Sequence, residues 1–335
     1  MKAIAPGKLI LSGEHAVVYG RPALAMAVNR HAESVIQPEV LEEIQFDLTD
    51  LHESERFTLR ALRELKTRIY KNYQFFLEGK LGIREVLHKP VELFEFAFIN
   101  LLDGLHLKAE KGLNIKLHST IPMGCGMGSS AATIVSVLRA IGHYFRVEFR
   151  PDWYLSYSIE AEKLQHGYSS GVDPYISLHG GCARFQQGQA KQLPLPRAGM
   201  YLVQTGAPQA TTGECVSHVR TQTGENAAIW NDFEAVTNAV EQALAANDRR
   251  DIRDAIRENH KLLTQIGVVP EKVQNFIHDV EAAGFAAKTC GAGAVAGDAA
   301  GMVLVFSDRQ PDALCKTHGY TAMTVHGDPL GVRVV

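Results

Sequence analysis

The 335-residue chain lacks any long uninterrupted apolar segment, because its most apolar stretch, residues 91–102, is short and contains two glutamates. A helix that spans a membrane needs about 20 predominantly apolar residues. No basic run followed by a long apolar region stands near Met1 either, so nothing resembles a signal peptide. We therefore expect a cytoplasmic protein with no membrane span and no membrane partner.

Cysteine is scarce, and the few cysteines are scattered. None of them shows the C-x-x-C spacing of zinc sites or redox motifs, and their number is odd. This excludes a regular disulfide framework and a zinc site, and it fits a reducing compartment. The cysteines are Cys125, Cys182, Cys215, Cys290 and Cys315.

The chain also lacks an excess of basic charge, since 34 Lys and Arg against 37 Asp and Glu give a formal net charge of −3. This balance argues against nucleic acid as a partner, and a hydrophobic content of 46% argues against disorder. Small molecules are the expected ligands. The length predicts about two domains, and a turn-rich segment places them at residues 1–182 and 183–335.

Periodicity predicts a mixture of strands and helices, and hence an α+β fold. Residues 113–119 alternate apolar and polar side chains like a half-buried strand, and residues 129–145 repeat apolar side chains at helical spacing. Two serines, Ser129 and Ser130, could cap that helix. Further predictions are short strands over 1–28, broken by turns at Pro6-Gly7, Ser12-Gly13 and Gly20, and strands at 182–185, 200–204 and 302–306. Helices are predicted at 53–79, 151–167, 227–246, 249–266 and 271–283. In the helix at 151–167 we expect Trp153, Tyr157 and Leu164 on the apolar side.

The turn PMGCGMGSSAA (residues 122–132) joins the predicted strand to the predicted helix. Glycines there let the backbone approach a ligand, while the free amides and the dipole of the helix end favour an anion such as a nucleotide phosphate. The turn lacks the lysine of GxxxxGK and does not fit GxGxxG. By itself it leaves a phosphate site and simple tight packing equally open.

Four separated stretches become specific when taken together: APGKLILSGEHAVVYG (5–20), PMGCGMGSSAA (122–132), HGYSSGVD (166–173) and KTCGAG (288–293). In this order the chain resembles the galactokinase, homoserine kinase, mevalonate kinase and phosphomevalonate kinase (GHMP kinase) superfamily. Its SGEHAVVYG segment (12–20) is similar to the sequences of the mevalonate kinase branch. The segment ENHKLLTQIGV (258–268) and the Thr211-Thr212 pair are similar to that branch as well.

The resemblance implies a ribosomal S5 domain 2-like N-terminal domain for ATP binding and catalysis, followed by a ferredoxin-like C-terminal domain. It implies ATP-dependent phosphorylation of the primary hydroxyl of mevalonate to 5-phosphomevalonate in isoprenoid biosynthesis, with ATP and Mg²⁺ as cofactors, and it allows a homodimer. Phosphoryl transfer asks the protein mainly to position reactants and to neutralise charge.

The same resemblance implies roles for individual residues. Asp173 would accept or orient the proton of the acceptor hydroxyl, and Lys8 would lie beside it. The implied sets are Gly124, Cys125, Gly126, Met127, Gly128, Ser129 and Ser130 for the nucleotide phosphates, Ser130 and Glu162 for Mg²⁺, and Glu14, His15 and Thr212 for the acceptor.

The third motif departs from the family pattern, because residues 294–296 are Ala-Val-Ala where glycines are expected and Asp298 adds a negative charge. Side chains there would crowd a backbone that has to approach phosphate. This keeps two alternatives open: a kinase for another acceptor such as phosphomevalonate, or a non-catalytic ligand-binding homologue. A phosphorylated acceptor would want extra cations, for which only Arg21 and Lys261 stand as candidates.

Overall fold

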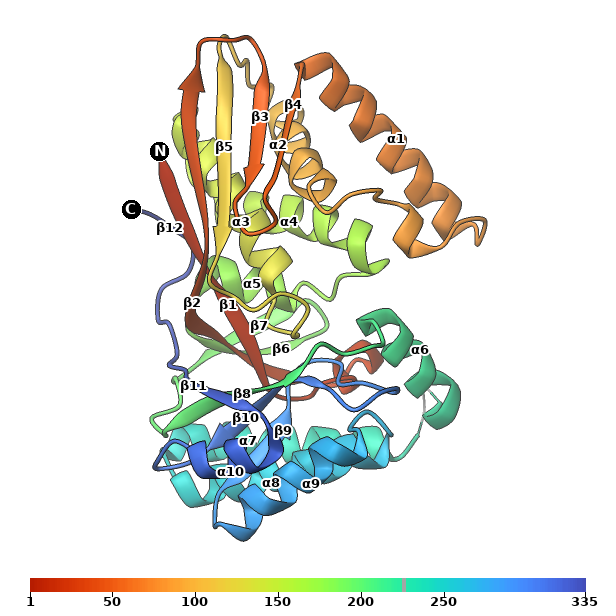
Figure 1. Ribbon diagram of the computed structural model, residues 1–335, viewed down its shortest axis with the longest axis vertical. Coiled ribbons are helices and arrows are strands. Elements are labelled where there is room, and N and C mark those ends of the chain that lie inside the picture. Colours follow the sequence, from red (N-terminus) through yellow and green to blue (C-terminus); the bar gives the residue numbers. More distant parts are fainter. Residues whose placement is uncertain (225–226) are drawn as a thin grey trace.

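The chain folds into two β-sheets that are each covered by helices (Figure 1), and the computed structural model describes residues 1–224 and 227–335. The first sheet runs in the order β12-β1-β2-β5-β3-β4, with β6 and β7 added beside β2. Its strands are β1 (Lys2–Ser12), β2 (Ala23–Glu39), β3 (Ile44–Leu48), β4 (Glu53–Phe57), β5 (Gly112–Ser119), β6 (Cys182–Gln186), β7 (Gln189–Leu193) and β12 (Arg333–Val334).

The second sheet is antiparallel and has the order β11-β8-β10-β9. Its strands are β8 (Met200–Gly206), β9 (Ala286–Thr289), β10 (Gly301–Phe306) and β11 (Thr321–Thr324). Helices connect β8 to β9 and β10 to β11, while β9 leads directly into β10. This is the βαββαβ arrangement of a ferredoxin-like unit, and the predicted α+β class is confirmed.

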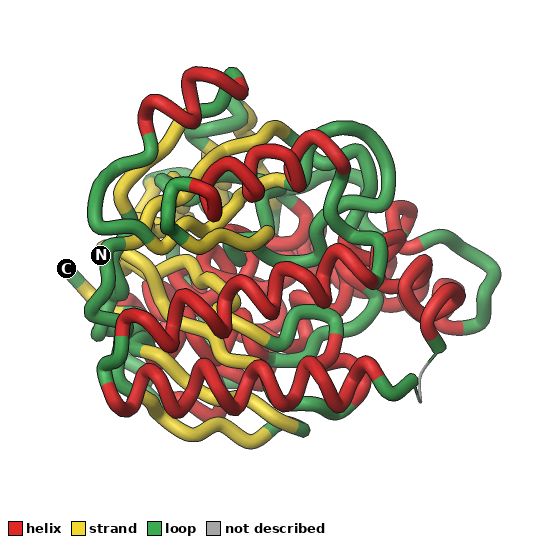
Figure 2. Tube along the Cα trace, turned by 90° about the horizontal axis from the view of Figure 1, so that it is seen from below, coloured by secondary structure: helices red, strands yellow, loops and turns green. Residues whose placement is uncertain are grey.

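Helices cover one face of each sheet. Those of the upper part in Figure 1 are α1 (Leu59–Leu77), α2 (Glu92–Gly104), α3 (Ser129–Tyr144), α4 (Pro151–His166) and α5 (Val172–His179). Those of the lower part are α6 (Thr212–Thr223), α7 (Ile229–Ala246), α8 (Arg249–Gln265), α9 (Glu271–Ala282) and α10 (Asp312–His318). Seen from below, long helices run side by side beneath the strands (Figure 2).

Most predicted elements are present, and a few are wrong. The strand around 113–119 and the helices after 129, 151, 229, 249 and 271 are confirmed. The predicted break at Pro6-Gly7 is wrong, because a β-bulge there keeps β1 paired with β2. The helix predicted over 53–79 begins only at Leu59, where the Thr58 side chain caps it, and the residues before it form β4.

The predicted apolar side of α4 is partly wrong. Trp153 is exposed, with the Arg150 guanidinium over its ring, whereas the neighbouring Tyr154 is fully buried. Tyr154 packs beside Gly142 of α3, where an added Cβ would lie 1.8 Å from its hydroxyl oxygen. The close approach of α3 and α4 therefore selects Tyr154 as the buried aromatic residue.

The division of the chain into domains at residues 1–182 and 183–335 remains a proposal. Two features of the structure cross this boundary. Strands β6 and β7 pair with the first sheet, so the chain changes sheets between Leu193 and Met200. The short β12 pairs with β1, which brings the C-terminal end back beside the N-terminal end (Figure 1). The second unit is therefore tied to the first at both of its ends.

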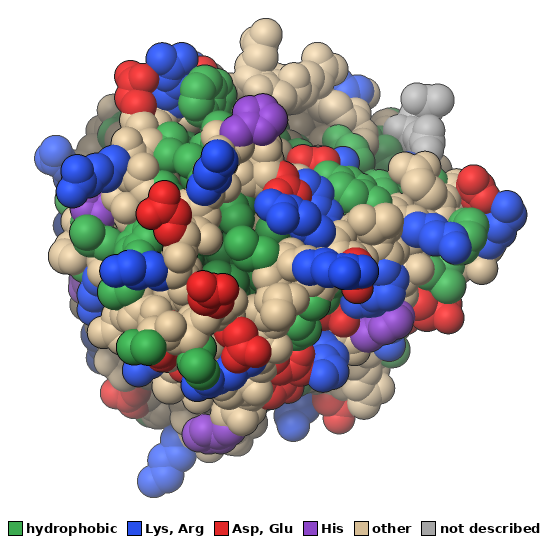
Figure 3. Space-filling view, turned by 90° about the horizontal axis from the view of Figure 1, so that it is seen from above, with side chains coloured by type: hydrophobic (Ala, Val, Ile, Leu, Met, Phe, Trp, Pro, Cys, Tyr) green, Lys and Arg blue, Asp and Glu red, His purple; other side chains and the backbone are tan. Residues whose placement is uncertain are grey.

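The surface mixes charges of both signs. Lys, Arg, Asp and Glu side chains alternate across the face seen in Figure 3. No helix within residues 1–224 and 227–335 combines the length and the apolar content needed to cross a membrane. All five cysteines are buried as free thiols.

The carboxyl group of Glu95, on α2, is fully buried among the helices that cover the first sheet. Neither of its oxygens has a hydrogen-bond partner among the described residues. Burial, followed by the charges of Glu55 and Glu92, raises the pKa of Glu95 to about 8. The folded protein therefore holds a proton on this group at neutral pH.

We expect Glu95 to make stability fall as pH rises from about 5 to about 8. The folded state binds the extra proton in this window, so the unfolding free energy drops by up to about 1.4 kcal/mol per pH unit. Glu95→Gln should flatten the profile of urea-denaturation midpoints between these pH values. The same change at the exposed Glu110 should leave the profile as in the wild type. Parallel profiles for wild type and Glu95→Gln would contradict the buried-proton assignment.

Candidate active site

Lys8 and Asp173 form an ion pair that joins β1 to the start of α5. The Lys8 side chain is almost fully buried, and its Nζ lies 3.1 Å from Oδ1 of Asp173. The backbone N–H of Lys8 donates to the Met127 carbonyl at 2.9 Å, which ties β1 to the glycine turn. The predicted approach of lysine and aspartate beside this turn is confirmed, although the two residues are 165 positions apart in the sequence.

The glycine turn needs its glycines for backbone conformation and for space. Gly124, Gly126 and Gly128 all have positive φ, at 68°, 75° and 67°. An added Cβ at Gly128 would lie 3.0 Å from Cγ of Lys8 and 3.2 Å from Oδ2 of Asp173. The backbone at the start of α3 therefore lies directly against the ion pair.

The N-terminus of α3 differs from the prediction in one respect. Gly128, in the left-handed conformation, is the N-cap and no side chain caps the helix, so the predicted capping by Ser129 and Ser130 is wrong. Both serines occupy the first turn, where amide N–H groups have no partner within the helix. The side chains of Cys125 and Met127 are buried, which leaves the backbone of these residues for contact with a ligand.

Glu162 of α4 brings a second carboxylate to the ion pair. It is buried, and it accepts a hydrogen bond from the Ser169 hydroxyl. Burial and the nearby charge of Asp173 raise the pKa of Glu162, while the Ser169 hydrogen bond and the Lys8 ammonium act in the opposite direction. Two acidic groups thus lie near one ammonium group, which pairs with Asp173, and this donor set suits an added cation.

The third motif packs backbone to backbone against the glycine turn. An added Cβ on Gly291 would lie 3.2 Å from Cα of Gly126, and one on Gly126 would lie 3.4 Å from Cα of Gly291. Of the three residues predicted to crowd this backbone, Ala294 is buried in the core of the second unit, Val295 packs against that core, and Ala296 is exposed. Asp298 is exposed, so its charge faces solvent.

The residues implied for the acceptor lie in different surroundings. His15 is buried, with Nε2 3.0 Å from the Ala292 carbonyl and with no partner for Nδ1 in the described part of the chain. Burial lowers the pKa of His15. Glu14 is buried and forms an ion pair with Lys288. Thr212 is exposed and is the first residue of α6.

Sequence reasoning missed three polar residues around these motifs. Lys288 opens the KTCGAG motif, Asn259 lies in the ENHKLL segment, and Ser169 lies in HGYSSGVD. A charged residue inside the short apolar strand AAKT was a usable signal for Lys288, because a lysine in a buried strand requires a partner. Nothing in the sequence indicated which carboxylate would be that partner.

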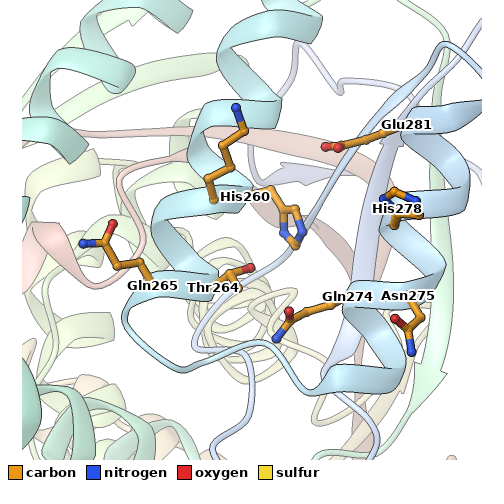
Figure 4. Close-up of a pocket in the computed structure, with 8 residues that line it drawn as sticks. His260, Thr264, Gln265, Gln274, Asn275, His278 and Glu281 are labelled. Atoms are coloured by element: carbon orange, nitrogen blue, oxygen red, sulfur yellow. The ribbon is translucent and has the colours of Figure 1, made fainter.

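A hollow of ≈ 510 Å³ between α8 and α9 is a different feature. Figure 4 shows polar side chains from the two helices pointing toward one another across it, among them His260, Thr264, Gln274 and His278. None of its lining residues belongs to the ion pair, the glycine turn or the third motif. The predicted site therefore lies elsewhere, where these motifs meet.

Comparison with known proteins agrees with this arrangement. The model of the GHMP kinases N terminal domain matches residues 92–181. The mevalonate kinase of Thermococcus sibiricus is 29% identical over 307 residues, covering 87% of this chain and 86% of that protein. The mevalonate kinase of Archaeoglobus fulgidus is 26% identical over 294 residues, covering 88% and 89%. The crystal structure of Methanococcus jannaschii mevalonate kinase superimposes with a TM-score of 0.81 at 24% identity and covers 98% of both chains.

The fold and the site define a two-domain α+β phosphotransferase for small molecules. It combines a glycine turn at a helix N-terminus with a lysine, an aspartate and a glutamate that meet beside it. Residues 92–181 match the GHMP kinases N terminal domain, and the chain is similar over most of its length to mevalonate kinases, which supports an ATP-dependent kinase.

Proposed function

We propose that this protein is a mevalonate kinase that transfers the terminal phosphoryl group of ATP to the primary hydroxyl of mevalonate. The observation that carries the proposal is the Lys8–Asp173 ion pair at 3.1 Å, which lies against Gly128, the N-cap of α3. The choice of acceptor rests on the relatives, since those of Thermococcus sibiricus and Archaeoglobus fulgidus are named mevalonate kinases.

Asp173 would act on the acceptor hydroxyl. Its carboxylate keeps a quarter of its side-chain surface exposed, while Lys8 is buried behind it. A hydroxyl that approaches Asp173 can donate its proton to the free carboxylate oxygen as the oxygen attacks phosphorus. A general base held in this way typically speeds a reaction by about 10²- to 10⁴-fold.

Lys8 and the glycine turn would stabilise the charge that develops during transfer. The Lys8 ammonium stands beside the forming bond, while the amides of Gly124–Ser130 and the positive end of α3 hold the donor phosphates. These groups are in place before the reaction, because β1 and the turn are joined by the Lys8–Met127 hydrogen bond. Fixed donors of this kind need no reorganisation in the transition state.

Glu162 and Ser130 would hold a Mg²⁺ ion. The described residues contain no cluster of three or more His, Cys, Asp or Glu side chains suited to a metal. A site with one protein carboxylate fits Mg²⁺, which usually completes its shell with phosphate oxygens and water. When bound, the ion would neutralise charge on the phosphates. Burial and the charge of Asp173 raise the pKa of Glu162, and a cation bound between the two acidic groups would favour the ionised form of both.

The structure argues for an unphosphorylated acceptor. Both cations considered for an acceptor phosphate are engaged with carboxylates: Arg21 with Glu234 at 2.7 Å, and Lys261 with Glu258 at 2.6 Å. Lys261 also lines the hollow between α8 and α9, and not the site described above. His15 and Thr212 remain proposed acceptor contacts, and a cytoplasmic homodimer remains a proposal.

A substrate panel tests the function. Purified protein with ATP and Mg²⁺ should release ADP with mevalonate and give 5-phosphomevalonate, which mass spectrometry identifies. Turnover with phosphomevalonate alone would replace the acceptor assignment. Binding of ATP and mevalonate without ADP release would instead support a non-catalytic homologue.

A further inference from the structure

A continuous chain of buried polar side chains joins the first sheet to the second unit. Ser12, at the end of β1, lies 2.8 Å from the Thr237 hydroxyl of α7 and donates to Oδ1 of Asn259 in α8 at 2.8 Å. The amide of Asn259 donates to Glu14 at 3.3 Å, and Glu14 pairs with Lys288 of β9. Each of these side chains is at most 1% exposed.

Lys288 uses all three of its ammonium hydrogens inside this network. They are donated to the Glu14 carboxylate, to the Ile10 carbonyl at 3.1 Å and to the Thr289 carbonyl at 3.1 Å. A buried charge is costly unless it is fully paired and hydrogen-bonded. This complete set of acceptors fixes the Lys288 side chain, and with it the end of β9 relative to β1.

The residues that follow Glu14 and Lys288 in the sequence lie at the part of the site proposed to bind the donor phosphates. After Lys288 the chain enters residues 290–293, where Gly291 lies against Gly126 of the glycine turn. After Glu14 comes His15, whose Nε2 lies 3.0 Å from the Ala292 carbonyl. Glu14 thus lies one residue before His15, and Lys288 lies three residues before Gly291, so the Glu14–Lys288 pair is close in sequence to both contacts that hold the third motif in place.

We propose that Lys288 is a positioning residue for the nucleotide. Its ion pair with Glu14 holds residues 290–293 against Gly126 and so sets the shape of the turn that binds the donor phosphates. The inference deepens the proposed function and rests on it. It also gives Glu14 an indirect role through Lys288, in place of direct contact with the acceptor.

Lys288→Met tests this role, because methionine keeps an unbranched apolar chain but donates no hydrogen bonds. We expect the Kd for ATP in the presence of Mg²⁺, measured by calorimetry without acceptor, to rise by about 10-fold or more, the effect of one lost charge-assisted hydrogen bond. The kcat at saturating ATP should fall much less, since Lys8 and Asp173 are not altered. An unchanged Kd in the folded variant would overturn the proposal.

The double variant Glu14→Gln/Lys288→Met separates positioning from folding. Removing both charges leaves no uncompensated buried charge, so stability should return toward the wild-type value. The Kd for ATP should stay raised, because methionine cannot donate to the carbonyls of Ile10 and Thr289. Recovery of both stability and affinity would show that the pair only balances charge, and would overturn the proposal.

Arg184→Met is the matched control. Arg184 of β6 pairs with Glu241 of α7 at 2.6 Å and also joins the first sheet to the second unit, but it touches none of the glycine motifs. This variant should lose stability with an unchanged Kd for ATP. An equal rise in Kd would mean that general loosening explains the effect, and the positioning role would be rejected.

The wild-type protein distinguishes the two levels of inference. If it binds ATP but phosphorylates no member of the acceptor panel, the proposed function fails, while the effect of Lys288→Met on Kd still decides the positioning role. If the wild type binds no ATP, both inferences fail.

Discussion

Asp173→Asn should lower kcat by about 10²- to 10⁴-fold, the usual contribution of a positioned general base. Asparagine has the same shape as aspartate, but it cannot accept the proton of the acceptor hydroxyl. The Kd for ATP should change little, because the amides of the glycine turn are untouched. Coupled assays of ADP release at saturating mevalonate and ATP give kcat, and calorimetry gives Kd.

Asp152→Asn serves as the control for this change. Asp152 is exposed in the first turn of α4, so the same substitution there should leave kcat at the wild-type value. Circular dichroism of both variants verifies that they are folded. A folded Asp173→Asn enzyme with wild-type kcat would remove Asp173 from the reaction, and the mechanism proposed above with it.

Lys8→Met should lower kcat by about 10²- to 10³-fold, comparable to the loss of one preorganised donor that stabilises developing charge. The substitution also leaves Asp173 and Glu162 facing each other without the ammonium. Removal of one partner of a fully buried ion pair costs about 3–5 kcal/mol, and the cost here is smaller because Asp173 remains 25% exposed. Kinetics at a temperature where the variant is folded measure the catalytic effect separately.

Lys66→Met is the corresponding control. Lys66 of α1 pairs with Asp103 at 3.3 Å, and Asp103 is about as exposed as Asp173, although Lys66 is less buried than Lys8. Its loss should change stability modestly and leave kcat unchanged. If both lysine variants reduced kcat equally, the loss would reflect damaged folding, and Lys8 would have no special place in the reaction.

The local elements could largely be predicted from the sequence. Alternation identified β5, helical spacing identified α3 and α7 to α9, and glycines with positive φ mark the turn before α3. Such patterns depend on neighbours within a few residues, so a single sequence carries them. Failures occurred where a distant partner decided the outcome: β2 keeps β1 continuous through its bulge, and α3 selects Tyr154 over Trp153.

For the candidate site, too, some residues could be predicted from the sequence and others could not. Lys8, Asp173, Glu162 and the glycine turn could be named from their motifs, and the structure brings them together. The contacts of Glu14 could not be foreseen, because Lys288 lies 274 positions further along the chain. Their pairing depends on how β9 packs beside the end of β1, which no local pattern specifies.

By itself the sequence determined the α+β class, the resemblance to the GHMP kinase superfamily, and the residues proposed to bind phosphate and to accept a proton. Only the tertiary structure decided which charges neutralise one another, and where the altered third motif puts its side chains. The physical reason is that a buried charge requires a partner at hydrogen-bond distance. Two sheets have to pack before the Glu14 carboxylate and the Lys288 ammonium can meet.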